Sequence, residues 1–392
     1  MTTETSIMER IYLDHAATTP VLPEVLDAMA PYFTVSFGNA SSLHAAGRDA
    51  RAALERARAT IAQAIGAQPA EVVFTSGGTE SDNAAVAGLT QGLPDAGRRS
   101  IVTSATEHHA VLAACEAHGT SGHAITVLPV NPDGTVNRES LARALADGPL
   151  IVSLMLANNE VGAITPYSGI ADEIHGAGAL LHTDAVQCLG KIPVNVAALG
   201  VDLMSISAHK VYGPKGIGAL YIRNGTPWSP VLFGGGQERG RRPGTENVAL
   251  AVGFARAVEA ALGTMSQEAA RLASLRDLLE QKLVGDLPGV LVNSCSAGRL
   301  PHLLNISFDD AVAPMEGEML IVNLDLMGIA ASSGSACTSG SVQPSHVLLA
   351  MGRTPATAAA SVRFSFGRSN TVEDVERVGG AMKEIVERMR RR

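Results

Sequence analysis

The sequence predicts an α/β protein of two domains, in which a large domain with a mainly parallel sheet precedes a smaller α+β domain. Seven apolar runs alternate with helical patterns through the first two-thirds of the chain, which is typical of buried parallel strands and their crossover helices. After about Asn247 the pattern changes to long helices and short strands. The length of 392 residues also exceeds one ordinary core and suits two domains.

The apolar runs are the candidate strands of the large domain. They lie at residues 71–74, 100–105, 125–130, 150–157, 180–184, 203–208 and 218–222. Between them, residues 47–67 carry apolar side chains three and four positions apart, with arginine and glutamate at the other positions. This spacing predicts an amphipathic helix that lies on the sheet.

The last third of the chain has a different pattern. We expect helices over 247–262 and 266–283, then short strands near Val290, Leu303 and Ser361, and a closing helix from Val372. Residues 330–341 are almost all small and include Cys337. Such a tract predicts a mobile loop.

Composition limits the class of protein. Hydrophobic residues make up 46% and charged residues 17% of the chain, as in a compact globule, and the formal net charge is -8. Basic residues are dispersed except at 390–392, which argues against direct nucleic-acid binding. Residues 1–10 lack an apolar signal core, and no run approaches the roughly 20 apolar residues of a membrane helix, so we expect a cytoplasmic protein that contacts no membrane.

The four cysteines are separate thiols in the sequence. Cys115, Cys188, Cys295 and Cys337 lie far apart without a CxxC pair, which argues against a zinc site or a disulfide framework. We therefore expect no metal. Composition alone favours small buried hydrophobes at these positions.

Lys210 is a candidate amine nucleophile. It follows the run 203–208 and precedes a glycine-rich turn, so it lies at the carboxyl edge of the expected sheet. A desolvated, neutral lysine there can form a Schiff base, and the neighbouring Ser207 and His209 suit a phosphate group. Taken alone, a solvated surface lysine is the simpler interpretation.

Asp184 ends another expected strand, 26 positions earlier. A carboxylate at that edge can hold the pyridine nitrogen of pyridoxal phosphate in its protonated form, which lets the ring accept electrons. Without Lys210, the simpler interpretation is a helix N-cap. The two residues together favour the cofactor site.

Two further features fit a flat phosphorylated ligand. Residues 74–81 join a strand to a helix expected to begin near Asp82, and their glycines leave backbone N–H groups free for an anion, although a plain connection has the same pattern. His108 follows another strand and could stack on a ring and carry protons, although histidines at such places are ordinarily surface residues.

These residues resemble the class V aminotransferase-fold cysteine desulfurases over almost the whole chain. The resemblance rests on nine ordered motifs: YLDHAATTP at 12–20, GNASSLH at 38–44, GGTES at 77–81, EH at 107–108, NNEVG at 158–162, HTDAVQ at 182–187, SAHK at 207–210, RPGTEN at 242–247 and SGSAC at 333–337. Many relatives have alanine in place of Gly78, proline in place of Ala40 and lysine in place of His109. None of these differences removes a catalytic group.

The resemblance implies the fold and the cofactor. It implies a type I fold of pyridoxal-phosphate-dependent transferases, with a large cofactor-binding domain at 15–255 and a small domain at 1–14 and 256–392 that carries a cysteine loop at about 331–342. The pyridoxal 5'-phosphate would be held by Lys210 as a Schiff base, by Asp184 at the ring nitrogen, by Asn158 and Gln187 at the ring hydroxyl side, by His108 stacked on the ring, and by Gly78, Thr79, Ser207 and His209 at the phosphate. Thr245 would reach the phosphate bound in the other subunit, which implies a homodimer.

The resemblance also implies the reaction. Arg363 would grip the carboxylate of L-cysteine, with Asn39 and Asn158 near the same pocket; otherwise Arg363 is a strand-edge arginine paired to a surface acid. Cys337 would take the sulfur as a persulfide and release alanine, with Lys210 and His108 moving protons. The sulfur would pass to an acceptor protein, such as an iron–sulfur scaffold or an enzyme of transfer-RNA or cofactor thiolation.

Other functions fit parts of the same pattern. An aminotransferase, a kynureninase-like hydrolase or a selenocysteine lyase would share Lys210 and Asp184, although the first two do not need Cys337. A non-catalytic scaffold or sulfur-carrier adaptor could keep the fold. The presence of the lysine, aspartate, histidine and cysteine together argues against the scaffold.

Overall fold

The large part of the protein is built on the predicted seven-stranded, mainly parallel sheet. The computed structural model describes residues 10–93, 100–294, 298–333 and 343–391. The strands follow the order β2-β8-β7-β6-β5-β3-β4, and only β8 runs antiparallel to its neighbours. They span β2 (Val72–Thr75), β3 (Ser100–Ser104), β4 (Ala124–Leu128), β5 (Ile151–Ser153), β6 (Leu180–Asp184), β7 (Leu203–Ser207) and β8 (Gly218–Ile222). The α/β fold class is confirmed.

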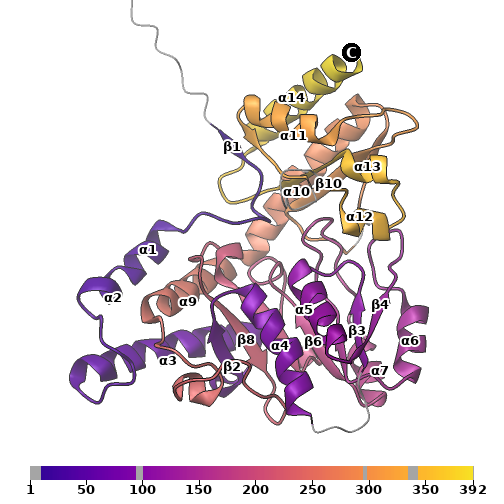
Figure 1. Ribbon diagram of the computed structural model, residues 1–392. Coiled ribbons are helices and arrows are strands. Elements are labelled where there is room, and N and C mark those ends of the chain that lie inside the picture. The colour runs from indigo at the N-terminus through magenta and orange to yellow at the C-terminus, as the bar shows by residue number, and fades with distance from the viewer. Residues whose placement is uncertain (1–9, 94–99, 295–297, 334–342, 392) are drawn as a thin grey trace, which may run out of the picture.

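Helices pack around this sheet (Figure 1). They are α3 (Ala45–Ile65), α4 (Gly78–Gly92), α5 (His109–Thr120), α6 (Arg138–Ala146), α7 (Ile170–Gly176), α8 (Val196–Leu199) and α9 (Val248–Leu262). Two further helices, α1 (Pro23–Met29) and α2 (Pro31–Thr34), extend away from the sheet and pack against α9. The helix predicted over 47–67 is α3, which buries Leu54, Ile61 and Ile65 and packs against α9. The short α2 stands at the end of the molecule farthest from the C-terminus.

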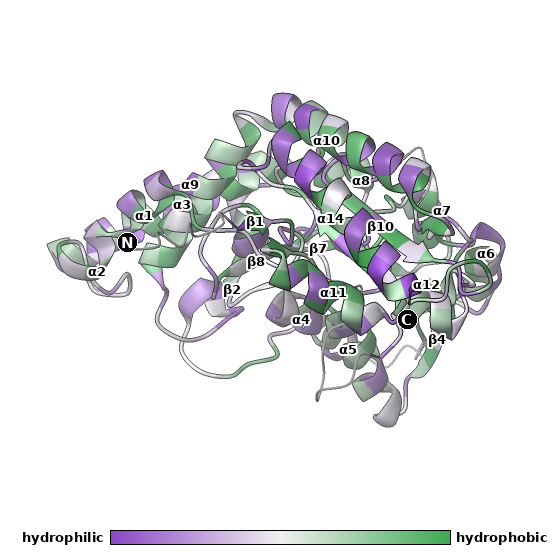
Figure 2. Ribbon diagram, turned by 90° about the horizontal axis from the view of Figure 1, so that it is seen from above, coloured by the Kyte–Doolittle hydropathy of each residue, from purple (hydrophilic) through white to green (hydrophobic). Residues whose placement is uncertain are grey.

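The C-terminal part contains a second sheet and its own helices. Strands β9 (Val290–Val292), β10 (Leu303–Phe308) and β12 (Ser361–Ser365) form an antiparallel sheet in the order β12-β10-β9. The helices are α10 (Met265–Asp286), α11 (Gly317–Leu326), α12 (His346–Ala350), α13 (Pro355–Ala359) and α14 (Val372–Arg390). Hydrophobic and hydrophilic stretches alternate along α10 and α14 (Figure 2), as expected of helices with one buried face.

The N-terminal segment joins the C-terminal part. Strand β1 (Ile11–Tyr12) pairs in parallel with β11 (Ile329–Ala330). Ile11 and Leu13 belong to a core cluster whose other buried members run from Leu272 to Val386. The main core of the sheet runs from Ala16 to Ala261, with Leu300 and Leu303 added. The chain crosses between the two cores at about residue 14, and the exact domain limits stay a prediction.

No single described helix is long and apolar enough to cross a membrane. Helices α9 and α10 reach that length and composition only as a pair, and the pair is bent by 70° at its break.

Candidate active site

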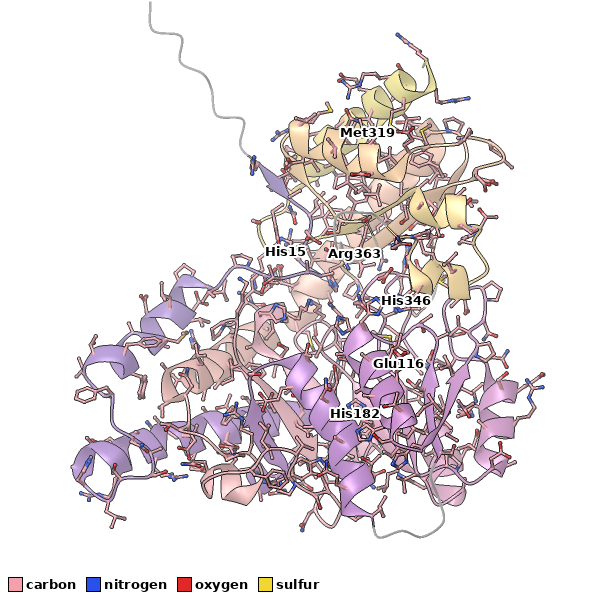
Figure 3. The ribbon with its side chains drawn as sticks, in the orientation of Figure 1. His15, Glu116, His182, Met319, His346 and Arg363 are labelled. Atoms are coloured by element: carbon pink, nitrogen blue, oxygen red, sulfur yellow. The ribbon has the colours of Figure 1, made fainter. Side chains whose placement is uncertain are left out.

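A cavity of about 590 Å³ lies where the two parts of the protein meet, at the carboxyl ends of the sheet strands. In open α/β sheets this edge is where ligands bind. The cavity is lined by eight of the predicted site residues: Gly78, Thr79, His108, Asp184, Gln187, His209, Lys210 and Arg363. Figure 3 shows Arg363 and His15 at this junction, with His182 deeper among the strands below.

Lys210 has the surroundings of a reactive amine. It ends the 3-10 turn Ala208–Lys210 that follows β7, and its Nζ donates to the carbonyl oxygens of Ala16 and Ala17, both at 2.7 Å. Burial, together with the charges of Lys191 and Arg363, lowers the pKa of Lys210 to about 7. A large fraction of the amine is therefore neutral near neutral pH, as Schiff-base formation requires. A solvated surface lysine would have no such shift.

Asp184 ends β6 and faces the same cavity. Its Oδ1 accepts from the backbone N–H of Val186 at 2.8 Å, and burial raises the pKa of Asp184 to about 6. The nearby Lys210 opposes this rise, so the carboxyl is mostly ionised at neutral pH. Gln187 donates from Nε2 to Ala16 at 3.0 Å, while its buried Oε1 has no partner among the described residues. A donor on a ligand could satisfy that oxygen.

The start of α4 and the end of β7 form an anion site. The helix begins at Gly78, four residues before the predicted start, so the N–H groups of Gly78 and Thr79 precede any helical acceptor. Gly77 adopts φ 152°, a backbone conformation that favours glycine. Gly218 must also lack a side chain, because a Cβ atom there would lie 2.8 Å from the backbone of Gly77. Ser207 lies against Gly78, and its buried hydroxyl has no partner among the described residues.

His108 is the N-cap of α5 and lines the cavity. Its Nδ1 accepts from the N–H of Ala110 at 3.1 Å, so the ring proton of the neutral imidazole is on Nε2. Burial, with the charge of Lys210 next, lowers the pKa of His108 to about 4. The imidazole is therefore neutral at physiological pH and presents Nε2–H as a hydrogen-bond donor.

Arg363 is held in place at the opposite wall. It lies on β12, is 6% exposed, and donates to Asp14 Oδ1 at 2.9 Å and to the carbonyl of Asn159 at 3.0 Å. Its buried Nε has no partner among the described residues. Strand β12 lies at the edge of its sheet and Arg363 pairs with the acidic Asp14, as expected of a strand-edge arginine paired to an acid. Arg363 nevertheless lines the cavity.

Asn158 lies behind the wall of the cavity. Its Oδ1 accepts from the N–H groups of Glu160 and Val161 at 2.8 and 2.9 Å, and its Nδ2 donates to Thr106 at 2.8 Å. These bonds fix the turn whose residues Asn159 and Glu160 line the cavity. In this chain Asn158 shapes the site, and its predicted contacts with cofactor and substrate stay a prediction.

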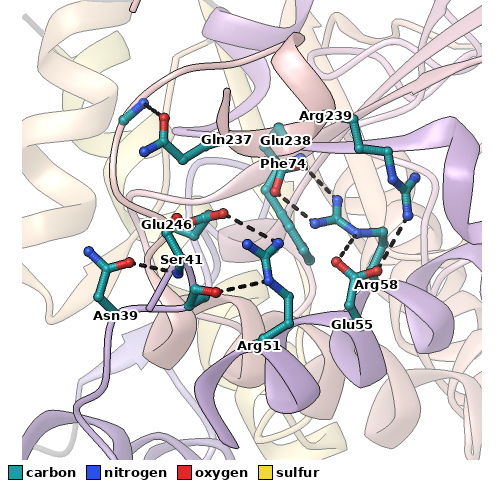
Figure 4. Close-up of polar contacts among 12 residues, drawn as sticks. Asn39, Ser41, Arg51, Glu55, Arg58, Phe74, Gln237, Glu238, Arg239 and Glu246 are labelled. Atoms are coloured by element: carbon teal, nitrogen blue, oxygen red, sulfur yellow. Dashed lines mark hydrogen bonds and ion pairs between the residues drawn. The ribbon is translucent and has the colours of Figure 1, made fainter. Parts of the chain in front are cut away.

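Thr245 and Asn39 lie away from the cavity of their own chain. Thr245 lines a second hollow of about 250 Å³, together with Ser76, Arg242 and Glu246. Asn39 is exposed and its Oδ1 accepts from the N–H of Ser41 (Figure 4). Figure 4 also shows Arg51 between this segment and Glu246, bonded to Ala40 and 3.7 Å from the Glu246 carboxylate. Asn39 is therefore not at the substrate pocket of its own chain, and the roles predicted for both residues stay predictions.

Cys337 lies outside the described residues, but both flanks of its segment are placed. Ser332 and Ser333 line the cavity on one side of the segment, and His346 lines it on the other. The backbone of Ser332 pairs with that of Arg363. The segment that carries Cys337 therefore begins and ends near the predicted substrate residues.

Several residues of the site were missed by sequence reasoning. Asp82 lines the cavity from α4, and Glu107 is buried with its Oε1 accepting from the N–H of Met155 at 2.5 Å. Burial raises the pKa of Glu160 to about 7, and its carboxylate accepts from Ser345. Asp14, Glu107 and Glu160 lie inside the sequence motifs at 12–20, 107–108 and 158–162. Their place in these motifs is the sequence feature that could have identified them as site residues.

The unsatisfied atoms fit pyridoxal phosphate. The Ser207 hydroxyl lies beside Gly78, whose free N–H lines the cavity, and the Gln187 oxygen belongs to a residue that lines the cavity together with Asp184. An acceptor-rich phosphate matches the first group, and a ring with a protonated nitrogen and a hydroxyl matches the second. The donor set and the ionised carboxyl thus suit the cofactor.

Known proteins are similar to this chain over almost its whole length. The family model of aminotransferase class-V matches residues 11–378. The protein named cysteine desulfurase IscS of Dictyoglomus turgidum is 46% identical over 97% of this chain and 95% of its own. The solved structure of a NifS-like protein has a TM-score of 0.89 and 36% identity, over 96% of this chain and 99% of its own. That of SspA in complex with cysteine has a TM-score of 0.78 and 32% identity, over 91% and 98%.

Members of this family are pyridoxal-phosphate-dependent enzymes, so the cofactor that the site predicts is also the family's cofactor. The chain belongs to the aminotransferase class-V family, among its cysteine desulfurases.

Proposed function

We propose that this enzyme moves the sulfur of L-cysteine onto Cys337 and releases alanine. The observation that carries the proposal is the joint placement of Lys210, Asp184 and Arg363 on one cavity, which is also lined by Ser333, the last described residue before the segment of Cys337. The relative from Dictyoglomus turgidum is named a cysteine desulfurase, and the SspA structure is a complex with cysteine.

Each residue has a defined task in this reaction. When bound, pyridoxal phosphate supplies an electron sink for the bonds at the substrate's Cα. Arg363 orients the substrate carboxylate by two parallel N–H donors. The free Lys210 amine takes the Cα proton, and its lowered pKa permits that base role near neutral pH. The Lys210 ammonium formed in that step can return the proton, and the Nε2–H of His108 can donate a hydrogen bond to the departing fragment, with the imidazolium form of His108 as the proton donor.

Cys337 completes the sulfur transfer. Its thiolate forms the S–S bond to the substrate sulfur while the Cβ–S bond breaks, and the carbon fragment leaves as alanine after taking up protons. The Cys337 persulfide then carries one sulfur atom to an acceptor thiol. This balance needs neither an external oxidant nor a keto-acid acceptor.

The acceptor belongs to the same proposal. An iron–sulfur scaffold, or an enzyme that thiolates transfer RNA or a cofactor, would receive the persulfide sulfur in the cytoplasm. A selenocysteine lyase or another class V enzyme is the alternative. Alanine formed from cysteine in equal amount to Cys337 persulfide, with no keto acid added, supports the desulfurase; alanine without persulfide would favour the lyase.

A second copy of the chain is the proposed partner at the α2 end. Phe33, Val35, Phe37 and Leu43 are between 57% and 92% exposed there, and Phe233 is 90% exposed. Arg51 joins the segment around Ala40 to Glu246, beside Thr245. Large exposed aromatic and aliphatic side chains in one region are typical of an interface. Burying them in a homodimer would bring Thr245 to the partner's site.

A further inference from the structure

Asp82 is a buried carboxyl group without a task in the reaction above. It lies one turn inside α4, is 1% exposed and lines the cavity. Helix α4 packs on β6 and β7. His182 and Asp184 alternate onto the same face of β6, and Ser205 on β7 stands in register with Asp184. Asp82 therefore covers a patch formed by His182, Asp184 and Ser205.

The patch contains no cation that could balance two carboxylates. Asp82 Oδ1 lies 3.8 Å from His182 Nε2 and has no hydrogen-bond partner among the described residues. Burial lowers the pKa of His182 to about 3, so this imidazole is neutral. Burial, and then the charge of Asp184, raises the pKa of Asp82 well above its usual range, and Glu107 acts in the same direction. The positive charge of Lys210, in contrast, lowers the pKa of Asp184.

A pair of serine–histidine contacts leads away from Asp82. The Ser205 hydroxyl lowers the pKa of the Asp82 carboxyl, and its Oγ lies 3.0 Å from His182 Nε2. On the other side of the ring, His182 Nδ1 lies 2.8 Å from Ser153 Oγ. A neutral imidazole has one donor and one acceptor, so all protons in these contacts must point the same way.

We propose that Asp82 is a protonated carboxylic acid that donates to Ser205, and that it leaves Asp184 as the charged member of the carboxyl pair at the cofactor's ring nitrogen. This inference rests on the proposed cofactor site. The Ser205 hydroxyl then donates to His182 Nε2, and His182 Nδ1–H donates to Ser153. Two adjacent buried carboxyl groups ionise separately because like charges repel strongly there. Asp82 is thus a positioning residue that acts through Asp184.

The tautomer of His182 reports the proton on Asp82. An ionised Asp82 would accept from Ser205, and these contacts would reverse, with the ring proton on Nε2 and Nδ1 accepting from Ser153. We expect nitrogen NMR of the holoenzyme, with His182→Gln used for assignment, to show the proton on Nδ1. An Nε2–H tautomer at neutral pH would overturn the proposal.

Infrared spectra and variants give a second measurement. The holoenzyme should show the carbonyl stretch of a protonated carboxylic acid at neutral pH that is missing in Asp82→Asn, and an unchanged band would overturn the assignment to Asp82. Asp82→Asn keeps a neutral group, so cofactor affinity should stay within about threefold, whereas Asp184→Asn should lose about tenfold or more. Equal losses in both variants would mean that Asp82 acts as an anion. These readouts need no turnover of cysteine, so they stand apart from the test of the desulfurase reaction.

Discussion

Arg363 and Ser332 are joined through their backbones: the N–H of Arg363 donates to the carbonyl of Ser332 at 2.7 Å, and the N–H of Ser332 donates back at 3.3 Å. The predicted substrate clamp and the start of the Cys337 segment are therefore one structural unit.

The first prediction concerns this clamp. Arg363→Lys replaces a planar pair of donors by a single ammonium, so the KM for cysteine should rise about 10- to 100-fold, with a smaller change in kcat. Steady-state kinetics of alanine release measure both values. Asp14→Asn is the matched variant, because it removes the charge that holds Arg363 Nη2 and leaves the guanidinium. An unchanged KM in Arg363→Lys would remove Arg363 from substrate binding.

The second prediction concerns the pH dependence of Lys210. Its pKa lies near 7, so below that pH the amine is protonated and unreactive, and above it the amine is neutral. The rate at which cofactor-free protein bonds pyridoxal phosphate should rise about tenfold per pH unit up to a midpoint near 7 and then level off.

A charge variant tests the cause of this shift. Lys191→Met removes a nearby positive charge, so the pKa of Lys210 and the midpoint should rise. Lys215→Met, at an exposed lysine, is the control and should leave the midpoint in place. A midpoint that stays or falls in Lys191→Met would contradict the electrostatic account.

The third prediction concerns the phosphate end. A methyl group on Gly78 would lie 2.9 Å from Val186 Cγ2, which is closer than side chains tolerate. Gly78→Ala should therefore weaken cofactor binding, measured by equilibrium dialysis. Val186→Ala should restore the affinity of Gly78→Ala. If the double variant binds no better than Gly78→Ala, the contact is not the cause.

The fourth prediction concerns the shared sites of the proposed homodimer. Lys210→Ala and Thr245→Asp should each be inactive, since one lacks the amine and the other sets a carboxylate against the partner's phosphate. In mixed dimers one site has neither change, so mixing equal amounts after subunit exchange should restore about a quarter of wild-type activity. Lack of any recovery, with exchange shown by mass, would refute the shared site.

The sequence predicted the regular parts of the fold because their signals are local. All seven apolar runs became strands of one sheet, although the run at 150–157 ends as a strand at Ser153, after which Leu154 and Leu156 still donate to β6. The pairing of β1 with β11 joins two-residue strands more than 300 positions apart, and no local pattern signals it.

Contacts within the site were less predictable because they join residues that lie far apart in the sequence. The Arg363–Asp14 ion pair spans 349 positions. The bonds of Asn158 depend on how residues 158–162 turn, which the residue types alone do not determine. Lys210 and Asp184 were found because the chemistry of the cofactor limits which side chains can stand at strand ends.

The central claim is that sulfur leaves cysteine for Cys337. Mass spectrometry of the holoenzyme after one turnover with L-cysteine, with alanine measured in the same sample, tests it most directly. We predict one added sulfur atom on the peptide that contains Cys337 and one alanine per active site, with Cys337→Ser keeping the cofactor absorbance but gaining no sulfur. Normal sulfide release by Cys337→Ser, or sulfur on a different cysteine, would contradict the account.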